Sequence, residues 1–348
     1  MKSTFTVQAP TRVDLAGGTL DLWPLFCLTE GARTINLALD LFAESTFALS
    51  ASDRFTVDFA SPTGAKHSIT APLSVEQCRK LDPTLRFPVS IASQYIRQCP
   101  SIPKKRISIA WKTRVPMGSG LGGSSTLGVS LLRGLGQVFG DFQKPGWQWR
   151  LLGIIKDAEA TFLETPTGTQ DYLAALFGGL SSFYSRAGEI VYTGYKKATF
   201  EALSDRVLVL FSGEQHHSGR SNWEIYKSAI DKDAATLRGI HGIRDLAEKM
   251  DAALQASKTD WSQVGRLLGE EWKIRRELFK VSTPRLDQLL EMLTKKNVYG
   301  AKVCGAAAGG SLLVLVDPAR RESVAREMAA AGVQVLPTDP VLHGVKLS

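Results

Sequence analysis

Residues 116–125 read Pro-Met-Gly-Ser-Gly-Leu-Gly-Gly-Ser-Ser, and the organisation of the chain can be worked out from this segment. The run at 106–111 before it is typical of a strand, and 124–139 has the composition of a helix. Closely spaced glycines let backbone amides approach an anion, and the following helix points its positive N-terminal end the same way. This order predicts a phosphate-binding loop, formed by Gly118, Ser119, Gly120, Leu121, Gly122, Gly123, Ser124 and Ser125.

Two well-known phosphate loops fit this segment less well. Its glycines match the dinucleotide pattern Gly-x-Gly-x-x-Gly, and Asp141 stands near the position of a ribose-binding acid. That fold needs a second strand ending at the acid, whereas helix-forming sequence continues to Gly140. A Walker loop requires Lys after its last glycine, where this chain has Ser124. A dinucleotide-dependent oxidoreductase is therefore kept only as an alternative.

The chain as a whole mixes strands and helices without regular alternation. Strands are expected at 4–8, 34–41, 45–50, 55–59, 106–111, 206–211, 312–316 and 333–336, and helices at 88–97, 124–139, 145–163, 170–177, within 221–293 and at 321–331. This pattern indicates an α+β fold. With 348 residues the chain is too long for one small core, so two domains around a cleft are expected.

Composition excludes several classes of protein. The formal net charge is +8, which suits a small anionic ligand, and no apolar run is long enough to cross a membrane. The basic clusters at 104–106 and 275–276 lack interleaved aromatic residues and are interpreted as solvated surface. Neither nucleic acid nor a membrane is an expected partner, and the sequence does not indicate an oligomeric state. A polar N-terminus and four scattered cysteines predict a cytoplasmic protein with reduced thiols.

Three segments together carry a family resemblance. The loop at 116–125 is similar to the second signature of the GHMP superfamily, which contains galactokinase, homoserine kinase, mevalonate kinase and phosphomevalonate kinase. Residues 9–21, Ala-Pro-Thr-Arg-Val-Asp-Leu-Ala-Gly-Gly-Thr-Leu-Asp, resemble the first signature, and 300–310, Gly-Ala-Lys-Val-Cys-Gly-Ala-Ala-Ala-Gly-Gly, resemble the third. The first signature and the segment 168–179 look most like the heptose 7-phosphate kinase and fucokinase branches.

The resemblance implies a two-domain GHMP kinase fold with the active site in the cleft between the domains. The first domain, residues 1–182, would be ribosomal-protein-S5-like and bind the nucleotide. The second, residues 183–348, would be ferredoxin-like. ATP and Mg²⁺ are the implied cosubstrate and cofactor.

The resemblance also implies roles for Asp171 and Arg12. On local grounds Asp171, at the start of a short helix, reads as a cap or helix-dipole partner. The family has its catalytic acid-base aspartate in this segment, where a carboxylate orients or deprotonates the acceptor hydroxyl. Arg12 reads locally as a surface ion-pair partner, but the family places an arginine near the transferred phosphoryl group.

Ser124 and Glu159 are the expected magnesium ligands. The Ser124 hydroxyl can either cap the helix that it opens or reach a magnesium ion bridging the phosphates. Glu159 stands twelve residues before Asp171, as the family's magnesium-binding glutamate does. Glu164 is the competing carboxylate.

Residues of the first and third signatures are expected to bind the acceptor: Asp21, Gly18, Thr19, Gly309 and Gly310, together with Asp171. Asp21 aligns with the sugar-binding aspartate of the sugar kinases, although a loop-to-helix cap is the ordinary interpretation. The third signature departs from the family pattern, since Ala307 and Ala308 stand where glycine is usual.

By resemblance the acceptor is a sugar or sugar phosphate, with the anomeric hydroxyl of a heptose 7-phosphate first, fucose or another monosaccharide second, and a mevalonate-type alcohol third. A catalytically silent ligand-binding protein of the same fold is the rival from a different class.

Overall fold

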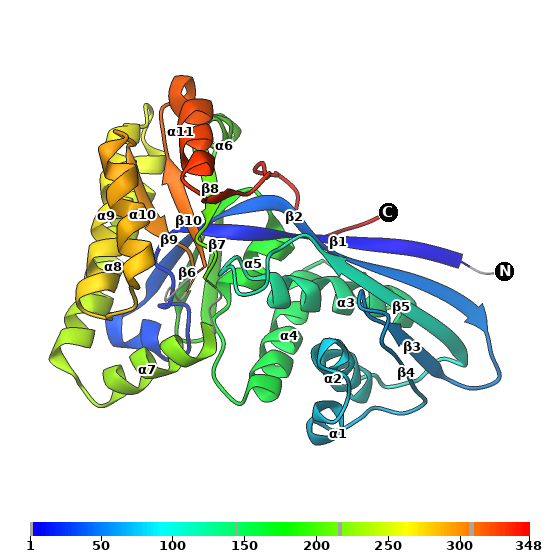
Figure 1. Ribbon diagram of the computed structural model, residues 1–348. Coiled ribbons are helices and arrows are strands. Elements are labelled where there is room, and N and C mark those ends of the chain that lie inside the picture. The colour runs from blue at the N-terminus through cyan, green and yellow to red at the C-terminus, as the bar shows by residue number, and fades with distance from the viewer. Residues whose placement is uncertain (1–2, 144, 215–217, 306–309) are drawn as a thin grey trace.

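The computed structural model describes residues 3–143, 145–214, 218–305 and 310–348. It contains an eight-stranded and a four-stranded β-sheet with helices packed on both (Figure 1). The two sheets account for the mixed α+β pattern of the sequence.

The large sheet is built on two long antiparallel strands, β1 and β2. Its strands are β1 (Ser3–Ala16), β2 (Ala32–Ala51), β3 (Thr56–Ala60), β4 (Lys66–Ile69), β5 (Lys105–Thr113), β6 (Leu180–Arg186), β7 (Glu189–Gly194) and β12 (Lys346–Leu347). The order is β12-β1-β2-β5-β3-β4, with the β6–β7 hairpin attached to the other half of β2. All pairs are antiparallel except β3 with β5.

Five helices lie on one side of the large sheet. They are α1 (Val75–Arg79), α2 (Pro83–Arg97), α3 (Gly123–Phe139), α4 (Trp147–Leu163) and α5 (Gln170–Phe177). The buried face of α3 presents Leu131, Leu132 and Leu135 to the same core as Phe47 of β2. Apolar residues at these helical spacings explain why the segment after the glycine loop folds as a helix against the sheet.

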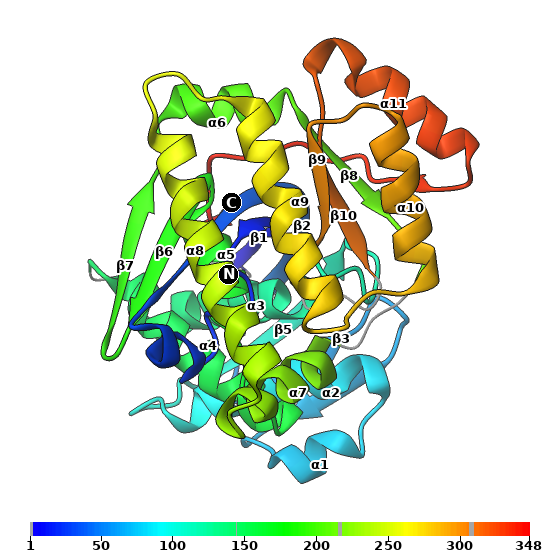
Figure 2. The ribbon, with the colours of Figure 1, turned by 90° about the vertical axis from the view of Figure 1, so that its left-hand side faces the viewer.

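The small sheet has the order β11-β8-β10-β9. Its strands are β8 (Val207–Phe211), β9 (Gly300–Val303), β10 (Ser311–Leu315) and β11 (Gln334–Val335), and the elements around it and the loop after β1 are η1 (Leu25–Thr29), α6 (Lys197–Ser204), α7 (Ser218–Ile230), α8 (Ala234–Gln255), α9 (Trp261–Glu277), α10 (Pro284–Lys295) and α11 (Pro318–Ala330). Strands β8 and β10 are buried throughout, as continuous apolar runs predict. Figure 2 shows α8, α9 and α10 side by side in front of the sheets.

One strand, β1, serves both cores. Val7 belongs to the core under α3, whereas Val13 belongs to the core shared with α8, α9 and the small sheet. The register between β1 and β2 shifts between Pro10 and Thr11. Beyond this shift Arg12 faces the loop before α3, so an irregularity in the sheet sets the direction of a candidate site residue.

Several predicted elements have different bounds in the structure. The strand expected at 4–8 is part of β1, which continues to Ala16. The strands expected at 34–41 and 45–50 are one strand, β2, whose irregular register near Phe42 explains the interruption in the sequence pattern. Helix α2 begins at Pro83 rather than Pro88, because Asp82 accepts a hydrogen bond from the Thr84 amide and proline is favoured in the first turn.

The domain division into 1–182 and 183–348 remains a prediction, and its boundary falls inside β6 of the large sheet. In the described ranges, no helix combines the length and the apolar character that a membrane crossing requires.

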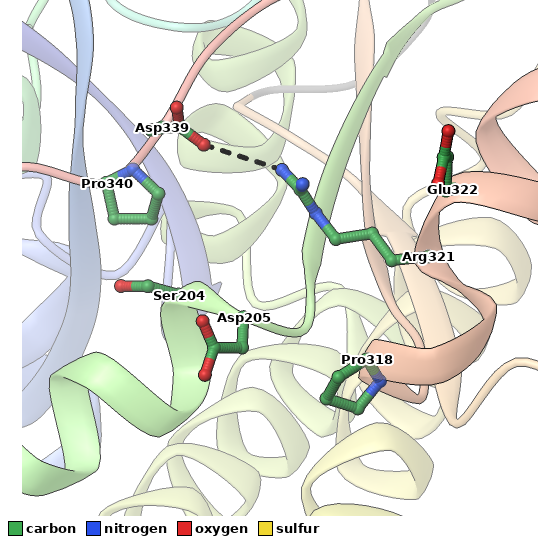
Figure 3. A pocket seen from close by; sticks show the side chains of 7 residues that line it. All are labelled: Ser204, Asp205, Pro318, Arg321, Glu322, Asp339 and Pro340. Atoms are coloured by element: carbon green, nitrogen blue, oxygen red, sulfur yellow. Dashed lines mark ion pairs between the residues drawn. The ribbon is translucent and has the colours of Figure 1, made fainter.

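A surface groove lies where α6, α11 and the C-terminal segment meet (Figure 3). It is lined by Ser204, Asp205, Pro318, Arg321, Glu322, Asp339 and Pro340. Arg321 spans it with an ion pair to Asp339 at 3.5 Å and donates a hydrogen bond to the Val207 carbonyl. None of the predicted site residues lines this groove.

We expect Gly134→Ala to destabilise the protein and Gly153→Ala to stabilise it. A Cβ at Gly134 in α3 would come within 2.0 Å of the buried Phe47 ring, whereas a Cβ at Gly153 in α4 meets nothing within 4 Å. Overpacking costs about 1–3 kcal/mol, and replacing an open helical glycine by alanine gains about 0.5–1 kcal/mol. Urea unfolding measures both, and equal stability of the two variants would contradict the packing of α3 on β2.

Candidate active site

The glycine loop joins β5 to α3, as the sequence predicts. Gly118, Gly120 and Gly122 all have positive φ, at 68°, 72° and 76°. A Cβ on Gly122 would lie 2.8 Å from Cγ of Asp171, so the absence of a side chain lets that carboxylate reach the loop. Helix α3 begins at Gly123, and its N-terminal amides border the loop in an arrangement suited to phosphate.

Arg12 connects this loop to Asp171. Its Nη1 donates to the Gly120 carbonyl at 2.7 Å, and its Nε donates to Asp171 Oδ1 at 2.8 Å. The Arg12 side chain is only 3% exposed, so it is no surface ion-pair partner, while Asp171 is 23% exposed. Burial lowers the pKa of Arg12, but the charges of Asp171 and Asp14 outweigh burial and raise it overall.

Ser124 lies against Glu159. The Ser124 hydroxyl donates to Glu159 Oε1 at 3.1 Å, and Tyr172 donates to Oε2 at 2.5 Å. The N-cap of α3 is Gly122 and no side chain caps it, so Ser124 does not serve as that cap. Burial raises the pKa of Glu159 in spite of hydrogen bonds that lower it. Glu164, by contrast, is 70% exposed and pairs with Arg79.

Asp21 holds the start of α5 from a distant loop. Its Oδ2 accepts hydrogen bonds from the backbone amides of Thr169 at 2.5 Å and Gln170 at 2.9 Å. A Cβ on Gly168 would lie 2.2 Å from the same oxygen, which explains the glycine at that position. Asp21 thus binds the start of a helix far along the chain, whereas the helix that follows it in sequence, η1, has no side-chain cap. Its other oxygen, Oδ1, is buried without a hydrogen-bond partner. Burial raises the pKa of this carboxyl.

The third signature backs directly onto the phosphate loop. Ser311 donates its amide to the Ser119 carbonyl at 2.7 Å, and a Cβ on Gly310 would lie 2.8 Å from that carbonyl oxygen. A Cβ on Gly120 would lie 2.8 Å from the Cys304 carbonyl oxygen. Of the predicted acceptor residues, Gly309 lies outside the described residues, as do Ala307 and Ala308.

A buried ionic network lies beside these loops. Lys302 on β9 donates to Asp14 Oδ2 at 2.6 Å and to Glu271 Oε1 at 2.7 Å, and Arg275 donates to Glu271 Oε1 at 3.0 Å. All four side chains are inaccessible to solvent. The interpretation of residues 275–276 as solvated surface is therefore wrong for Arg275 and holds for Arg276, which is 56% exposed.

Sequence reasoning missed these four residues as site components. The signal available for two of them was the i, i+4 spacing of Glu271 and Arg275, which is common on solvent-exposed helices. Asp14 and Lys302 lie inside the first and third signatures, but the sequence pattern alone assigns no role to either. Glu271 and Arg275 contact residues of the first signature that are 254 to 257 positions away in the chain.

The structure therefore gathers most predicted residues around one place. Figure 1 shows α3 and α5 close beneath β1. The glycine loop, Arg12, Asp171 and Ser124 belong to these elements and their junctions, and Glu159 comes from α4. The arrangement combines a glycine-rich loop at a helix N-terminus, a buried guanidinium and a partly exposed carboxylate. Such a set can bind a polyphosphate and hold a hydroxyl beside it.

Comparisons with known proteins agree with this arrangement. Residues 87–179 match the GHMP kinases N terminal domain, and residues 250–334 match GHMP kinases C terminal. The D-glycero-alpha-D-manno-heptose 7-phosphate kinase of Campylobacter jejuni is 26% identical over 331 residues, covering 93% of both chains. The bifunctional fucokinase/GDP-fucose pyrophosphorylase of Arabidopsis thaliana is 24% identical over 92% of this chain, which spans 30% of that longer protein.

Solved structures show the same fold over nearly the whole chain. A D-glycero-D-manno-heptose 1-phosphate kinase from Bacteriodes thetaiotaomicron has a TM-score of 0.74 at 21% identity, covering 99% of this chain and 98% of the other. The Methanococcus jannaschii mevalonate kinase also gives 0.74, at 16% identity with 97% and 99% covered. The predicted two-domain α+β fold is confirmed, and the two family matches in chain order show that this chain belongs to the GHMP kinase family.

Proposed function

We propose that this chain is a sugar kinase that transfers the γ-phosphoryl group of ATP to a hydroxyl of a sugar or sugar phosphate. The observation that carries the proposal is the contact of Arg12 with both the Gly120 carbonyl and Asp171, at 2.7 and 2.8 Å. This contact puts a positive charge between the loop that would hold the phosphates and the carboxylate that would receive the acceptor.

In the proposed reaction an acceptor hydroxyl beside Asp171 attacks the γ-phosphorus. The bond from that phosphorus to the β–γ bridging oxygen breaks, ADP leaves, and the hydroxyl proton passes to the Asp171 carboxylate. Arg12 stabilises the charge on the migrating phosphoryl group, since its guanidinium stays ionised and is fixed by two partners.

Ser124 and Glu159 fit a magnesium ion. They supply hard oxygen donors from a hydroxyl and a carboxylate 3.1 Å apart, and Mg²⁺ usually takes only one or two protein ligands beside phosphate and water. The raised pKa of the buried Glu159 fits a carboxylate that lacks a neighbouring cation in the protein. When bound, the metal would neutralise phosphate charge, while Tyr172 orients the carboxylate through its hydroxyl.

A hydroxyl-rich acceptor is supported by Asp21. Its Oδ1 is buried without a hydrogen-bond partner, and so is the side-chain Oε1 of Gln170. The backbone amide of Gln170 donates to the other oxygen of the Asp21 carboxylate. Unpartnered buried acceptors of this kind are suited to sugar hydroxyls, which donate hydrogen bonds. The Campylobacter jejuni relative, matching over 93% of both chains, makes a heptose 7-phosphate with a free anomeric hydroxyl the first choice. Fucose and other monosaccharides come next.

The test is ADP release from ATP and Mg²⁺ with a panel of D-glycero-D-manno-heptose 7-phosphate, fucose, galactose and mevalonate. We expect a sugar or sugar phosphate to stimulate release by at least about tenfold over water. Stimulation by mevalonate alone would replace the sugar assignment. ATP binding without stimulation by any member would favour the catalytically silent alternative.

Asp171→Asn should lower kcat by about 10²–10⁴-fold, because the amide cannot accept the hydroxyl proton. ATP affinity should stay within a few-fold of the unaltered enzyme, which equilibrium titration measures. Asp157→Asn is the control, since Asp157 is a 72% exposed carboxylate on α4. Retention of turnover in Asp171→Asn would remove Asp171 from its proposed role.

Glu159→Gln should raise the Mg²⁺ concentration needed for half-maximal rate by about tenfold. It should also raise the melting temperature of the metal-free protein at pH 7.5. The pKa of Glu159 is higher in the folded than in the unfolded chain. The folded state therefore loses stability as pH rises from the unfolded to the folded pKa, and glutamine, which does not ionise, removes this loss. The gain should shrink below about pH 4, where the carboxyl is protonated in both states.

The exposed Glu164→Gln serves as the control for both measurements. A shifted Mg²⁺ requirement in Glu164→Gln but not in Glu159→Gln would transfer the proposed metal role to Glu164.

A further inference from the structure

The loop after β1 has a strained conformation next to the proposed acceptor site. Thr19 has φ of 79°, which is uncommon for a β-branched residue and costs energy unless its surroundings hold it. Asp21, whose carboxylate fixes the start of α5, follows two residues later. The conformation at Thr19 therefore decides where Asp21 lies relative to Asp171.

Glu271 and Arg275 of α9 hold this loop. Glu271 Oε2 accepts the amide of Gly17 at 3.0 Å. Arg275 donates through Nη2 to the Gly18 carbonyl at 2.5 Å and through Nη1 to the Thr19 hydroxyl at 3.2 Å. The planar guanidinium thus forms hydrogen bonds with two successive residues of the loop, while its Nε pairs with Glu271 at 3.0 Å.

Asp14 and Lys302, the other two residues of the ionic network, complete a set of buried charges with no net charge. Lys302 bridges Glu271 and Asp14, so two positive and two negative side chains share one buried site. Asp14 also accepts the Gly305 amide at 3.0 Å, which ties the third signature to the first. Burial alone would raise the pKa of Asp14, but Lys302, Arg12 and Arg275 hold it well below its usual range.

Such a network is a weak source of stability. Removing water from four charges is costly, and apolar replacements of buried ion pairs are often neutral or stabilising. The network forms hydrogen bonds with buried backbone groups of the loop, the Gly17 amide and the Gly18 carbonyl, which apolar side chains cannot do.

We propose that Glu271 and Arg275 are positioning residues that set acceptor affinity by fixing the loop from Gly17 to Asp21. Both are inaccessible to solvent and would not touch the acceptor themselves. The inference rests on the proposed sugar kinase function for its kinetic consequence, but the effect on the loop itself does not depend on that function.

Arg275→Lys keeps the charge but cannot reach three partners in fixed directions. With the most active sugar of the panel, we expect acceptor KM to rise by about tenfold, with ATP KM unchanged within about twofold. Amide hydrogen exchange of the peptide spanning residues 15–26 should be faster, in the absence of any ligand. The control is Arg276→Lys, the exposed neighbour paired with Asp287, which should behave like the unaltered enzyme.

The double variant Glu271→Gln with Arg275→Met separates positioning from stability. It removes one charge of each sign, so Lys302 and Asp14 still neutralise each other. Loss of the bond to the buried Gly18 carbonyl should lower the melting temperature, but by less than the single Arg275→Met variant does, which also leaves a buried charge unpaired. The grip on Gly18 and Thr19 is nevertheless lost, so acceptor KM and local exchange should rise as in Arg275→Lys.

A folded double variant with unchanged acceptor KM and unchanged exchange would overturn the inference, as would an equal rise in acceptor and ATP KM. If no sugar supports turnover by the unaltered enzyme, the proposed function fails instead. The exchange measurement then still decides whether these residues hold the loop.

Discussion

The site depends on one constraint, that a charge removed from water must be paired. Arg12 lies at the centre of it, almost inaccessible to solvent, between the Gly120 carbonyl and Asp171. Satisfying that one guanidinium requires β1, the phosphate loop and the start of α5 to meet. The same requirement at Asp14, Glu271, Arg275 and Lys302 is met only where α9 and β9 lie against the first signature. Pairing of buried charges thus restricts how distant segments of the chain can be arranged around the site.

The carboxylates of the site fall into two groups according to whether the protein supplies a cation. Asp14 faces Lys302, and its pKa is lowered despite burial. Glu159 and Asp21 are buried beside hydroxyls and backbone amides, and burial raises the pKa of both. The first kind has its counter-charge within the chain, whereas no cation of the protein is among the causes of the pKa shift of the second kind. This difference is consistent with the proposed binding of a metal at Glu159 and of hydroxyl donors at Asp21.

The sequence predicts the local parts of this site well. Strand, glycine loop and helix lie where residues 106–139 place them, because glycine spacing and apolar periodicity act within short stretches. The first signature and the segment 168–179 also bring in Arg12 and Asp171, which stand 159 residues apart. The long-range contacts were not predictable in this way. The grip of Arg275 on Gly18 and Thr19, and the hold of Asp21 on α5, depend on tertiary packing that leaves no periodic signal. The one local clue, Glu271 four residues before Arg275, is the same for a buried pair and an exposed one.

The close packing of the phosphate loop on the third signature has a consequence for how the site responds to change. Gly120 and Gly310 approach neighbouring carbonyls so closely that no side chain fits between the two segments. Because Ser311 also bonds to Ser119, a displacement of either segment must move the other. Asp14 then extends this coupling, through Gly305, to the loop that carries Asp21. The backbone of the proposed phosphate subsite and that of the proposed acceptor subsite are therefore joined by hydrogen bonds within the protein, through Ser311 to Ser119 and through Gly305 to Asp14.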